Sequence, residues 1–278
     1  MTPLTLLYAP GDRPPVVGKA LASSADVVQI DLEDAVVPSH KDEARAGLEQ
    51  WASTLAVRPA RVRVNGVTTP WHTADVEAVG ALPLTVGVVL PKAERVEDVA
   101  ALARALPGRA IHLLIESAAG LTAVDELARI ESVSSIGLGE ADLRADLGCD
   151  EAGLAYPRSR LVVAARSAGL PAPSMSVYPD IHDLAGLAAS CEVGRSLGFR
   201  GRAAIHPAQL PVIRQAFLPG PAEIAQAEAI IECYQAAGDQ GQGAVAMPDG
   251  TFLDEAVVRR ARTTLEWAGE NRYGEKHR

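Results

Sequence analysis

Charged and amide side chains stand at the ends of several apolar, β-branched segments of this 278-residue chain. In a barrel of parallel strands, groups at the carboxyl ends of the strands and in the loops after them meet at one mouth. Carboxylates, a guanidinium and an ammonium gathered there can hold a metal ion, bind an anionic substrate and move a proton. The residues in question are Asp31, Glu33, Asp34, Arg63, Asn65, Lys92, Glu116, Glu140, Asp142 and His206.

Glu116 and Asp142 are the candidates for metal ligands. They follow neighbouring apolar segments, so their carboxylates can meet on one cation without either being protonated. Oxygen ligation suits Mg²⁺, which uses one or two protein carboxylates and keeps several waters. Alternatively, both acids pair with arginine or lysine, or cap the next helix, as Glu116 before Ser117 could. The spacing leaves both interpretations open.

Asp31, Glu33 and Asp34, which we call the acidic cluster, directly follow an apolar segment. Three carboxylates this close repel one another unless a cation lies near them. They could support a metal site from behind its ligands, or form ion pairs with nearby cations. The candidate cations are Lys41, Arg45 and Arg63.

Arg63 ends an apolar segment, where its planar fork suits a substrate carboxylate or carbonyl. It could instead neutralise the acidic cluster, and the two roles are compatible. Lone histidines such as His206 are more often hydrogen-bonded structural residues than bases, so we assign it no catalytic role. Asp254, taken alone, is typical of an N-cap for the last helix. Gly137 and Gly139 are expected to let the backbone approach a ligand closely.

The elements that must position these residues alternate along the chain. Short apolar runs are each followed by a stretch that can form a helix. The runs lack apolar–polar alternation, as expected of parallel strands covered on both faces. Eight such units in about 210 residues predict an α/β fold, a (β/α)8 TIM-type barrel. The expected strands are 5–10, 27–33, 61–65, 86–92, 111–116, 134–139, 173–178 and 201–206, with helices such as 41–55, 96–106, 121–130 and 158–168.

Residues 219–278 exceed what a barrel requires, so we expect a catalytic barrel over 1–218 and a C-terminal helical extension after it. Segments 219–237 and 252–267 are expected to be helical, and the Gly- and Gln-rich stretch 238–243 to be a linker. An extension on such a linker could cover its own barrel mouth as a lid or reach a neighbouring subunit. Both possibilities remain open.

Composition narrows the class of protein. Hydrophobic residues make up 48% and charged residues 22%, as in ordinary globular chains. The net charge of -9 argues against a nucleic-acid groove and against a basic membrane-binding face. Cys149, Cys191 and Cys233 show neither zinc spacing nor a disulfide framework. No signal peptide or membrane span is expected, and a cytoplasmic location fits best.

Several motifs at these segment ends recur in a fixed order. In that order they resemble the citrate lyase beta-subunit-like family of the HpcH/HpaI aldolase superfamily, over nearly the whole chain. Each motif is weak alone, but together they are specific. They are Tyr8-Ala9-Pro10-Gly11-Asp12-Arg13-Pro14, Asp31-Leu32-Glu33-Asp34-Ala35-Val36, Arg63-Val64-Asn65, Leu90-Pro91-Lys92, Leu114-Ile115-Glu116-Ser117, Gly139-Glu140-Ala141-Asp142-Leu143, Arg158-Ser159-Arg160 and Ile205-His206-Pro207-Ala208-Gln209.

The resemblance implies roles for individual residues. Glu116 and Asp142 match two Mg²⁺ ligands, so that Glu116 also meets the substrate that chelates the ion. Arg63 matches the arginine that grips the keto-acid or carboxylate end of the substrate. Glu33 and Asp34 would steady the waters on the metal.

Asp254 matches an aspartate that the family's C-terminal tail carries into a neighbouring subunit's site, where it acts as an acid and base. A homo-oligomer, a trimer or a dimer of trimers, is therefore expected. Arg13 and Lys92 are candidate neighbours of the coenzyme A phosphates or pantetheine. The family usually has an aspartate at the end of the seventh strand where this chain has Ser176, so the resemblance does not fix the acyl group.

The function so implied is that of a Mg²⁺-dependent carbon–carbon lyase. It would cleave a 3-hydroxyacyl-CoA resembling citramalyl-, malyl-, citryl- or hydroxymethylglutaryl-CoA into acetyl-CoA and a keto acid. The metal and Arg63 would polarise a carbonyl, and Asp254 would handle one proton. The alternatives are a malate-synthase-like condensation, an acyl-CoA thioesterase using the same site, or a non-catalytic subunit that binds CoA esters in a larger complex.

Overall fold

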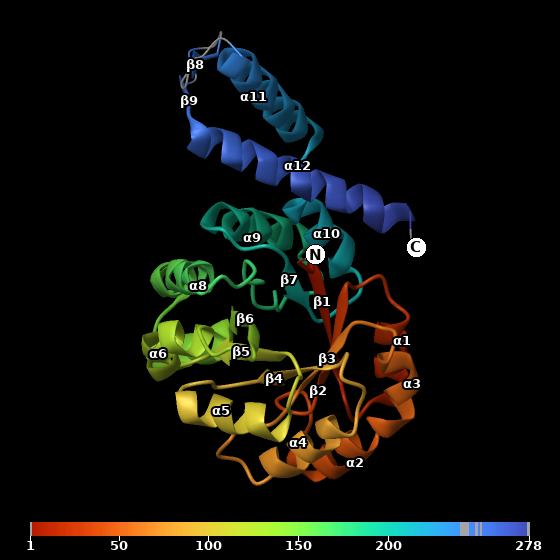
Figure 1. Ribbon diagram of the computed structural model, residues 1–278. Helices are drawn as coiled ribbons and strands as arrows, with labels where there is room; N and C mark the ends of the chain where they lie inside the picture. The colour runs from red at the N-terminus through yellow and green to blue at the C-terminus, as the bar shows by residue number, and fades with distance from the viewer. Residues whose placement is uncertain (1, 240–244, 248–249, 251, 277–278) are drawn as a thin grey trace. The chain divides into compact units, whose positions relative to one another are not determined.

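The computed structural model describes residues 2–239, 245–247, 250 and 252–276. Figure 1 shows the chain, which divides into two compact units, Thr2–Arg214 and Gln215–Arg278. The sequence had suggested a division after residue 218, four residues further along. The candidate metal ligands and Arg63 all belong to the first unit, and Asp254 belongs to the second.

A curled sheet of seven parallel strands forms the core of the first unit. In its strand order, β6-β5-β4-β3-β2-β1-β7, the first six strands lie beside the strands next to them in sequence, and β7 pairs with β1. All five residues of β2 are buried, as expected of a strand covered on both faces. The strands are β1 (Thr5–Pro10), β2 (Val27–Asp31), β3 (Ala60–Arg63), β4 (Gly87–Leu90), β5 (Ile111–Ile115), β6 (Val133–Leu138) and β7 (Arg202–Ala204).

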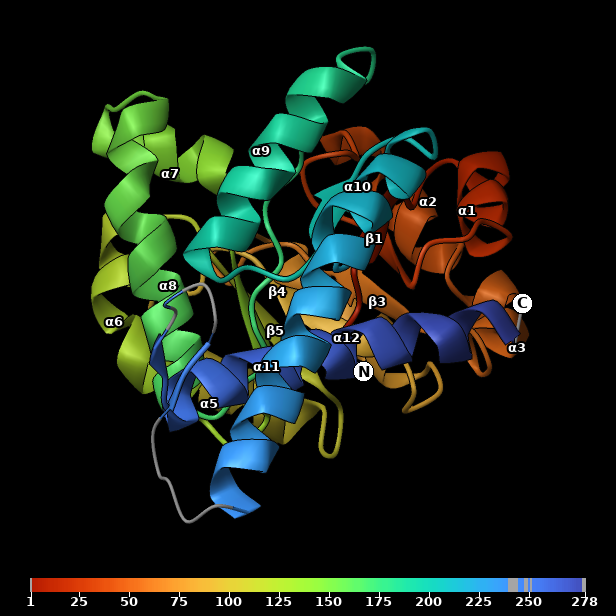
Figure 2. The ribbon, with the colours of Figure 1, turned by 90° about the horizontal axis from the view of Figure 1, so that it is seen from above.

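Helices connect these strands and lie on the outer side of the curled sheet, as Figure 2 shows. Helix α6 is N-capped by Ser117, whose hydroxyl accepts a hydrogen bond from Gly120 N at 3.1 Å. The helix expected over 41–55 is broken into α2, a 3₁₀ turn and α3. The connecting helices are α1 (Pro14–Leu21), α2 (Lys41–Ala46), α3 (Ala52–Leu55), α4 (His72–Gly80), α5 (Val96–Ala105), α6 (Ala118–Ala128), α7 (Glu140–Leu147), α8 (Ala155–Ser167) and α9 (Leu184–Leu197). Helix α10 (Gln209–Phe217) follows β7 and includes the boundary between the two units.

The prediction of a strand over 173–178 is wrong. This segment makes one isolated bridge to the sheet, between Met175 and Arg202 of β7, and contains Ser176. Prolines at 171, 173 and 179 remove backbone donors from the segment and its flanks, so a continuous ladder cannot form. Among the described residues the sheet therefore has seven strands rather than eight, in an arrangement consistent with a TIM-type barrel.

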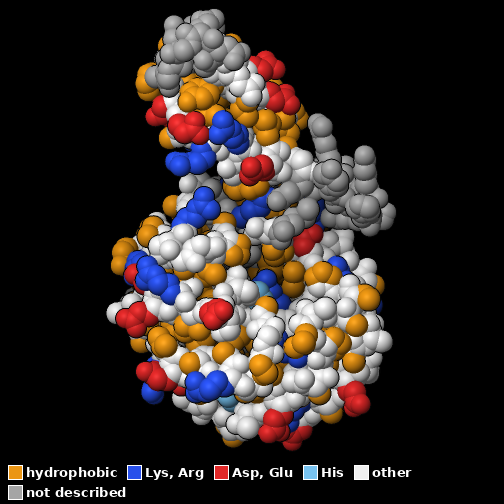
Figure 3. Space-filling view, in the orientation of Figure 1, with side chains coloured by type: hydrophobic (Ala, Val, Ile, Leu, Met, Phe, Trp, Pro, Cys, Tyr) orange, Lys and Arg blue, Asp and Glu red, His pale blue; other side chains and the backbone are white. Residues whose placement is uncertain are grey.

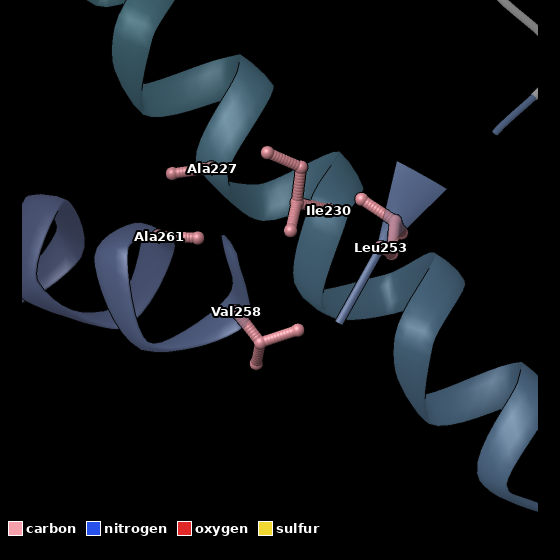
Figure 4. Close-up of a cluster of buried hydrophobic side chains, with 5 residues drawn as sticks. All are labelled: Ala227, Ile230, Leu253, Val258 and Ala261. Carbon is pink, nitrogen blue, oxygen red and sulfur yellow. The ribbon is translucent and has the colours of Figure 1, made fainter. Parts of the chain in front are cut away.

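The second unit contains two long helices, α11 (Pro221–Asp239) and α12 (Glu255–Lys276). A two-stranded antiparallel sheet of β8 (Val245–Ala246) and β9 (Phe252–Leu253) lies between them in sequence. The linker expected over 238–243 is only partly described, since α11 extends to Asp239 and residues 240–244 lie outside the described chain. The buried cluster in Figure 4 joins both helices and β9 through Ala227, Ile230, Leu253, Val258 and Ala261.

On the face seen in Figure 3, Lys and Arg side chains and Asp and Glu side chains are scattered among hydrophobic and other surface over the first unit. Cys149, Cys191 and Cys233 are free thiols, in agreement with the sequence, which indicated no disulfide framework. None of the helices in the described part of the chain is both long and apolar enough to cross a membrane.

Candidate metal and substrate site

The carboxyl ends of β2, β3, β5 and β6 bring the predicted residues of the first unit to one edge of the sheet. Asp31 ends β2 and lies in register with Arg63, the last residue of β3. Glu116 directly follows β5, and Asp142 lies in the first turn of α7, after β6. Because β5 and β6 are paired neighbours, the two candidate metal ligands come from adjacent connections.

Arg63 is held by a two-pronged ion pair with Asp31. Its Nε and Nη2 donate to the two carboxylate oxygens at 2.8 and 2.6 Å. Its Nη1 lies 3.1 Å from Glu33 Oε2 and 3.6 Å from Asp34 Oδ2, and its guanidinium lies over the ring of Tyr8, 5.1 Å from the centroid. Burial disfavours the charge, but hydrogen bonds and attraction from Asp31 hold the pKa of Arg63 well above its usual value. Arg63 is thus a fixed cation.

The acidic cluster takes its positive charge from Arg63 rather than from Arg45. Arg45 instead pairs with the buried Asp75 at 2.9 Å and with Asp42 at 2.8 Å. Lys41 is buried and donates to Leu32 O, Glu33 O and Asn65 Oδ1 at 2.6 to 2.7 Å. Of the three predicted partners, only Arg63 contacts the carboxylates of the cluster directly.

Glu116 is a buried carboxylate that lacks donors. Its side chain is 1% exposed, and within the described residues neither Oε1 nor Oε2 has a hydrogen-bond partner. Burial, with the neighbouring carboxyls of Asp142 and Glu33, raises the pKa of Glu116 to about 8, against the opposing charges of Lys92 and Arg63. Such a group is costly to ionise unless a cation binds it. The orphaned oxygens therefore fit a metal ion.

Gly139 makes room for this carboxylate. A β-carbon on residue 139 would lie 2.4 Å from Glu116 Cγ and 2.6 Å from Cδ, closer than β-carbons come to non-bonded atoms. We had expected Gly137 and Gly139 to admit a ligand. At Gly139 the absence of a side chain leaves room for Glu116 instead. At Gly137 a β-carbon would have Leu114 Cδ2 as its nearest neighbour, at 3.3 Å.

Asp142 differs from Glu116 in exposure, since 49% of its side chain is accessible. One candidate ligand is thus buried and the other borders solvent. In the described chain no three His, Cys, Asp or Glu residues are grouped as a metal site. Two carboxylates with the remaining positions open is the donor set expected for Mg²⁺, which keeps waters and accepts substrate oxygens.

Helix α7, which carries Asp142, is anchored by its first residue. Glu140 accepts two hydrogen bonds from Arg158 of α8, at 2.7 and 2.9 Å, and both side chains are buried. Arg158 also contacts Glu151 at 2.7 Å. Glu140 is therefore engaged away from the ligand pair, and it fixes the start of α7.

Lys92 lies after β4, among the strand-end residues that the sequence placed at the mouth, but its contacts with the candidate metal ligands were not predicted. Its Nζ lies 2.6 Å from Glu33 Oε1, 3.8 Å from Glu116 Oε2 and 3.9 Å from Asp142 Oδ2. We had assigned it only the role of a candidate coenzyme A neighbour. The signal in the sequence was its position at the end of an apolar run, directly after Pro91.

Asp254 caps α12 in the second unit. Its Oδ1 accepts a hydrogen bond from Val257 N at 2.9 Å, and its carbonyl accepts one from Val258 N. This agrees with the N-cap that the sequence suggested. His206 is exposed, and its Nδ1 accepts a hydrogen bond from Ala208 N at 3.2 Å, in keeping with a structural role.

Comparison with known proteins identifies relatives over almost the full chain. The (3S)-malyl-CoA thioesterase of Cereibacter sphaeroides is 35% identical and spans 94% of this chain and 93% of its own length. The L-malyl-CoA/beta-methylmalyl-CoA lyase of the same species is 30% identical, over 94% and 93%. The crystal structure of CitE from Mycobacterium tuberculosis with magnesium, acetoacetate and coenzyme A superimposes with a TM-score of 0.83 at 32% identity, covering 96% of this chain and 98% of that one.

The pattern of conserved residues that defines HpcH/HpaI aldolase/citrate lyase proteins matches residues 4–207. This range includes every strand of the curled sheet and both candidate metal ligands. The chain therefore belongs to the HpcH/HpaI aldolase/citrate lyase family.

Proposed function

We propose that this protein is a Mg²⁺-dependent carbon–carbon lyase that cleaves a 3-hydroxyacyl-CoA into acetyl-CoA and a keto acid. Citramalyl-, malyl-, citryl- and hydroxymethylglutaryl-CoA are the candidate substrates. The observation that carries the proposal is the pair of orphaned carboxylate oxygens on buried Glu116, beside Asp142 and Arg63. The magnesium, acetoacetate and coenzyme A bound in the M. tuberculosis relative give it independent support.

Glu116 and Asp142 are the residues that would hold the magnesium. When bound, the ion supplies Lewis-acid polarisation of the carboxylate and hydroxyl or keto oxygens of the substrate. Glu33 and Asp34 would order the water around it. Glu33 is suited to this role because its two oxygens are fixed by different cations, Oε2 by Arg63 and Oε1 by Lys92.

Arg63 would bind the carboxylate or carbonyl end of the substrate. Two of its nitrogens are fixed by Asp31, so the fork keeps one orientation, and Nη1 faces the acidic cluster. A substrate oxygen that binds here meets a permanent cation that needs no reorientation. This preorganisation lets the carbonyl that develops on cleavage be stabilised as soon as it forms.

Carbon–carbon cleavage also requires one proton to be removed and another delivered. The hydroxyl of the substrate loses a proton as it becomes a carbonyl, and the departing carbon of the acetyl-CoA fragment gains one. We propose Asp254 for this role, carried by the C-terminal extension into a neighbouring subunit's site in a trimer or dimer of trimers. The motif resemblance supports this assignment.

A thioesterase acting on the same esters is the second candidate function. It is favoured by the 35% identity to a (3S)-malyl-CoA thioesterase over 94% of this chain. Both reactions would use the same recognition elements, the metal ion and Arg63 for the carboxylate end of the substrate and a separate site for its thioester. They differ in the bond that breaks, carbon–carbon or carbon–sulfur.

Product analysis separates these functions. Purified protein is incubated with Mg²⁺ and each candidate ester, and the products are resolved by chromatography. A lyase releases acetyl-CoA and keto acid in equal amounts, whereas a thioesterase releases free coenzyme A and the hydroxy acid. Acetyl-CoA supplied with glyoxylate or pyruvate tests the reverse condensation. If the wild type forms none of these products, so that its product profile is the same as that of Glu116→Gln, the enzymatic proposal fails in favour of a non-catalytic CoA-ester-binding subunit.

A further inference from the structure

Lys92 has an unusual backbone for its residue type. Its φ is 49°, which makes it the non-glycine residue with a left-handed conformation in the described part of the chain. A residue with a β-carbon is disfavoured there, and such conformations concentrate at functional sites. Lys92 follows β4 and Pro91, where an exposed lysine could extend into water in an ordinary conformation.

The strained backbone directs the ammonium toward carboxylates. Nζ donates a hydrogen bond to Glu33 Oε1 at 2.6 Å, although 46% of the Lys92 side chain is exposed. The same Nζ lies 3.8 Å from Glu116 Oε2 and 3.9 Å from Asp142 Oδ2. Lys92 thus positions Glu33 and faces both of the proposed metal ligands.

This placement opposes the binding of a divalent cation. An ion held by oxygens of Glu116 and Asp142 would lie next to an ammonium that is less than 4 Å from each of them. Solvent screens part of this repulsion, because 46% of the Lys92 side chain is exposed, but the side of the site formed by Glu116 is buried and excludes that screening. The carboxylates already have one internal counter-cation, so the metal must share them.

An anionic ligand changes this balance. The negative charge of a keto acid bound at the mouth attracts the Lys92 ammonium, Arg63 and the divalent ion. The keto acid therefore offsets the repulsion between the ammonium and the metal ion. Two ligands that favour each other in this way are coupled, and the coupling is the same in both directions.

We infer that Lys92 is a positioning residue that weakens the binding of Mg²⁺ alone and strengthens the binding of the anionic substrate, so that metal and substrate bind as a pair. The inference rests on the proposed metal site. It adds a determinant of metal affinity that neither coordinates the ion nor belongs to the acidic cluster.

The test measures Mg²⁺ binding by calorimetry in the full-length protein. Lys92→Gln and Lys92→Met remove the charge, and Lys92→Arg retains it. Both neutral variants are expected to bind Mg²⁺ alone about tenfold more tightly than wild type, and Lys92→Arg to bind within about threefold of it. Lys19→Gln, a charge removal at an exposed position of α1, is the matched control and should leave the affinity unchanged. Unchanged or weaker Mg²⁺ binding by the neutral variants overturns the inference.

The second arm titrates pyruvate at saturating Mg²⁺. The neutral variants are expected to bind pyruvate about tenfold more weakly, and equal affinity overturns the coupling between metal and anion. Thermal melting checks folding, and if Lys92→Met does not fold, Lys92→Gln and Lys92→Arg still compare a neutral with a charged side chain at this position. Glu116→Gln separates the two levels of the argument. If wild type binds Mg²⁺ no better than Glu116→Gln, the proposed metal site fails. If Glu116→Gln binds Mg²⁺ more weakly than wild type but the neutral Lys92 variants bind it with wild-type affinity, the metal site stands and only the inference about Lys92 fails.

Discussion

Glu116 occupies the space that a side chain at Gly139 would fill, with its Cγ 2.4 Å from the position of the missing β-carbon. Gly139 is tied to the end of β5 by a hydrogen bond from its N to Ile115 O at 3.0 Å. Neither backbone can easily withdraw, so the side chain of Glu116 must yield to any added atom. The placement of the candidate metal ligand therefore depends on a glycine that contributes no ligand atom.

Gly139→Ala is expected to displace Glu116 and weaken Mg²⁺ binding at least tenfold. Overpacking of this kind costs about 1–3 kcal/mol, so the melting temperature should also fall. The φ of Gly139 is -92°, which alanine adopts freely, so the effect is steric. Gly137→Ala is the control, because its β-carbon would meet a flexible side-chain atom at 3.3 Å. Equal Mg²⁺ affinity in the two variants would refute this dependence.

Arg63→Lys retains the positive charge but loses the fork that Asp31 aligns. We expect kcat/KM for the best ester to fall about a hundredfold, because an ammonium cannot contact Asp31 through two nitrogens and still face the substrate. Arg160→Lys is a matched control, since Arg160 makes a similar two-pronged pair with Asp125 at 2.8 and 2.7 Å. Steady-state kinetics with nearly wild-type values for Arg63→Lys would contradict the assigned role.

The metal-free protein should lose stability as pH rises. Burial raises the pKa of Glu116 from 4.5 to about 8, so between these values the folded chain keeps a proton that the unfolded chain releases. Stability from this group is complete below about pH 4.5 and declines as pH approaches 8. Glu116→Gln, which stays neutral, should exceed wild type by about 2–4 kcal/mol at pH 8 and differ little at pH 5.

Urea unfolding in the presence of a chelator, at several pH values, measures this difference. Saturating Mg²⁺ should remove the wild type's disadvantage, because the ion replaces the proton on Glu116. Parallel stability curves for wild type and Glu116→Gln in chelator would show that Glu116 is not the titrating group.

Asp254 is testable by subunit mixing. If the acid and base come from a neighbouring subunit, an Arg63→Ala chain and an Asp254→Ala chain, each inactive, should regain ~a quarter of the wild-type rate when refolded together, since random pairing in a symmetric oligomer completes that share of the sites. Mixing Arg63→Ala with the double variant cannot complete any site and serves as the control. No gain in mixed oligomers would argue against a shared site.

Much of the site could be predicted because parallel strands bring their carboxyl ends together. That rule placed Arg63 beside Asp31, which the strand register confirms, and it placed Glu116 and Asp142 after the neighbouring strands β5 and β6. It could not predict the position of the Lys92 ammonium, because a left-handed φ is not encoded by a recognisable pattern in Leu90-Pro91-Lys92. Nor did it anticipate that Gly139 accommodates a side chain.

The error in the fold has a local cause. Residues 173–178 contain enough apolar side chains to suggest a strand, but the prolines in and beside the segment limit it to the single bridge at Met175. The prediction relied on hydrophobicity, whereas the prolines, which lack backbone N–H donors, decide the structure of this segment. The first strand has the expected bounds, and each of the other strands ends a little earlier than expected, which places Glu33, Lys92 and Glu116 in the loops after the strands.

Calorimetric titration of Mg²⁺ into wild type, Glu116→Gln and Asp142→Asn tests the central claim most directly. We predict one saturable site per chain in the wild type, no detectable binding in Glu116→Gln and at least tenfold weaker binding in Asp142→Asn, with all three proteins folded. Wild-type affinity in Glu116→Gln would contradict the account, because the buried carboxylate could then not be the residue that holds the metal.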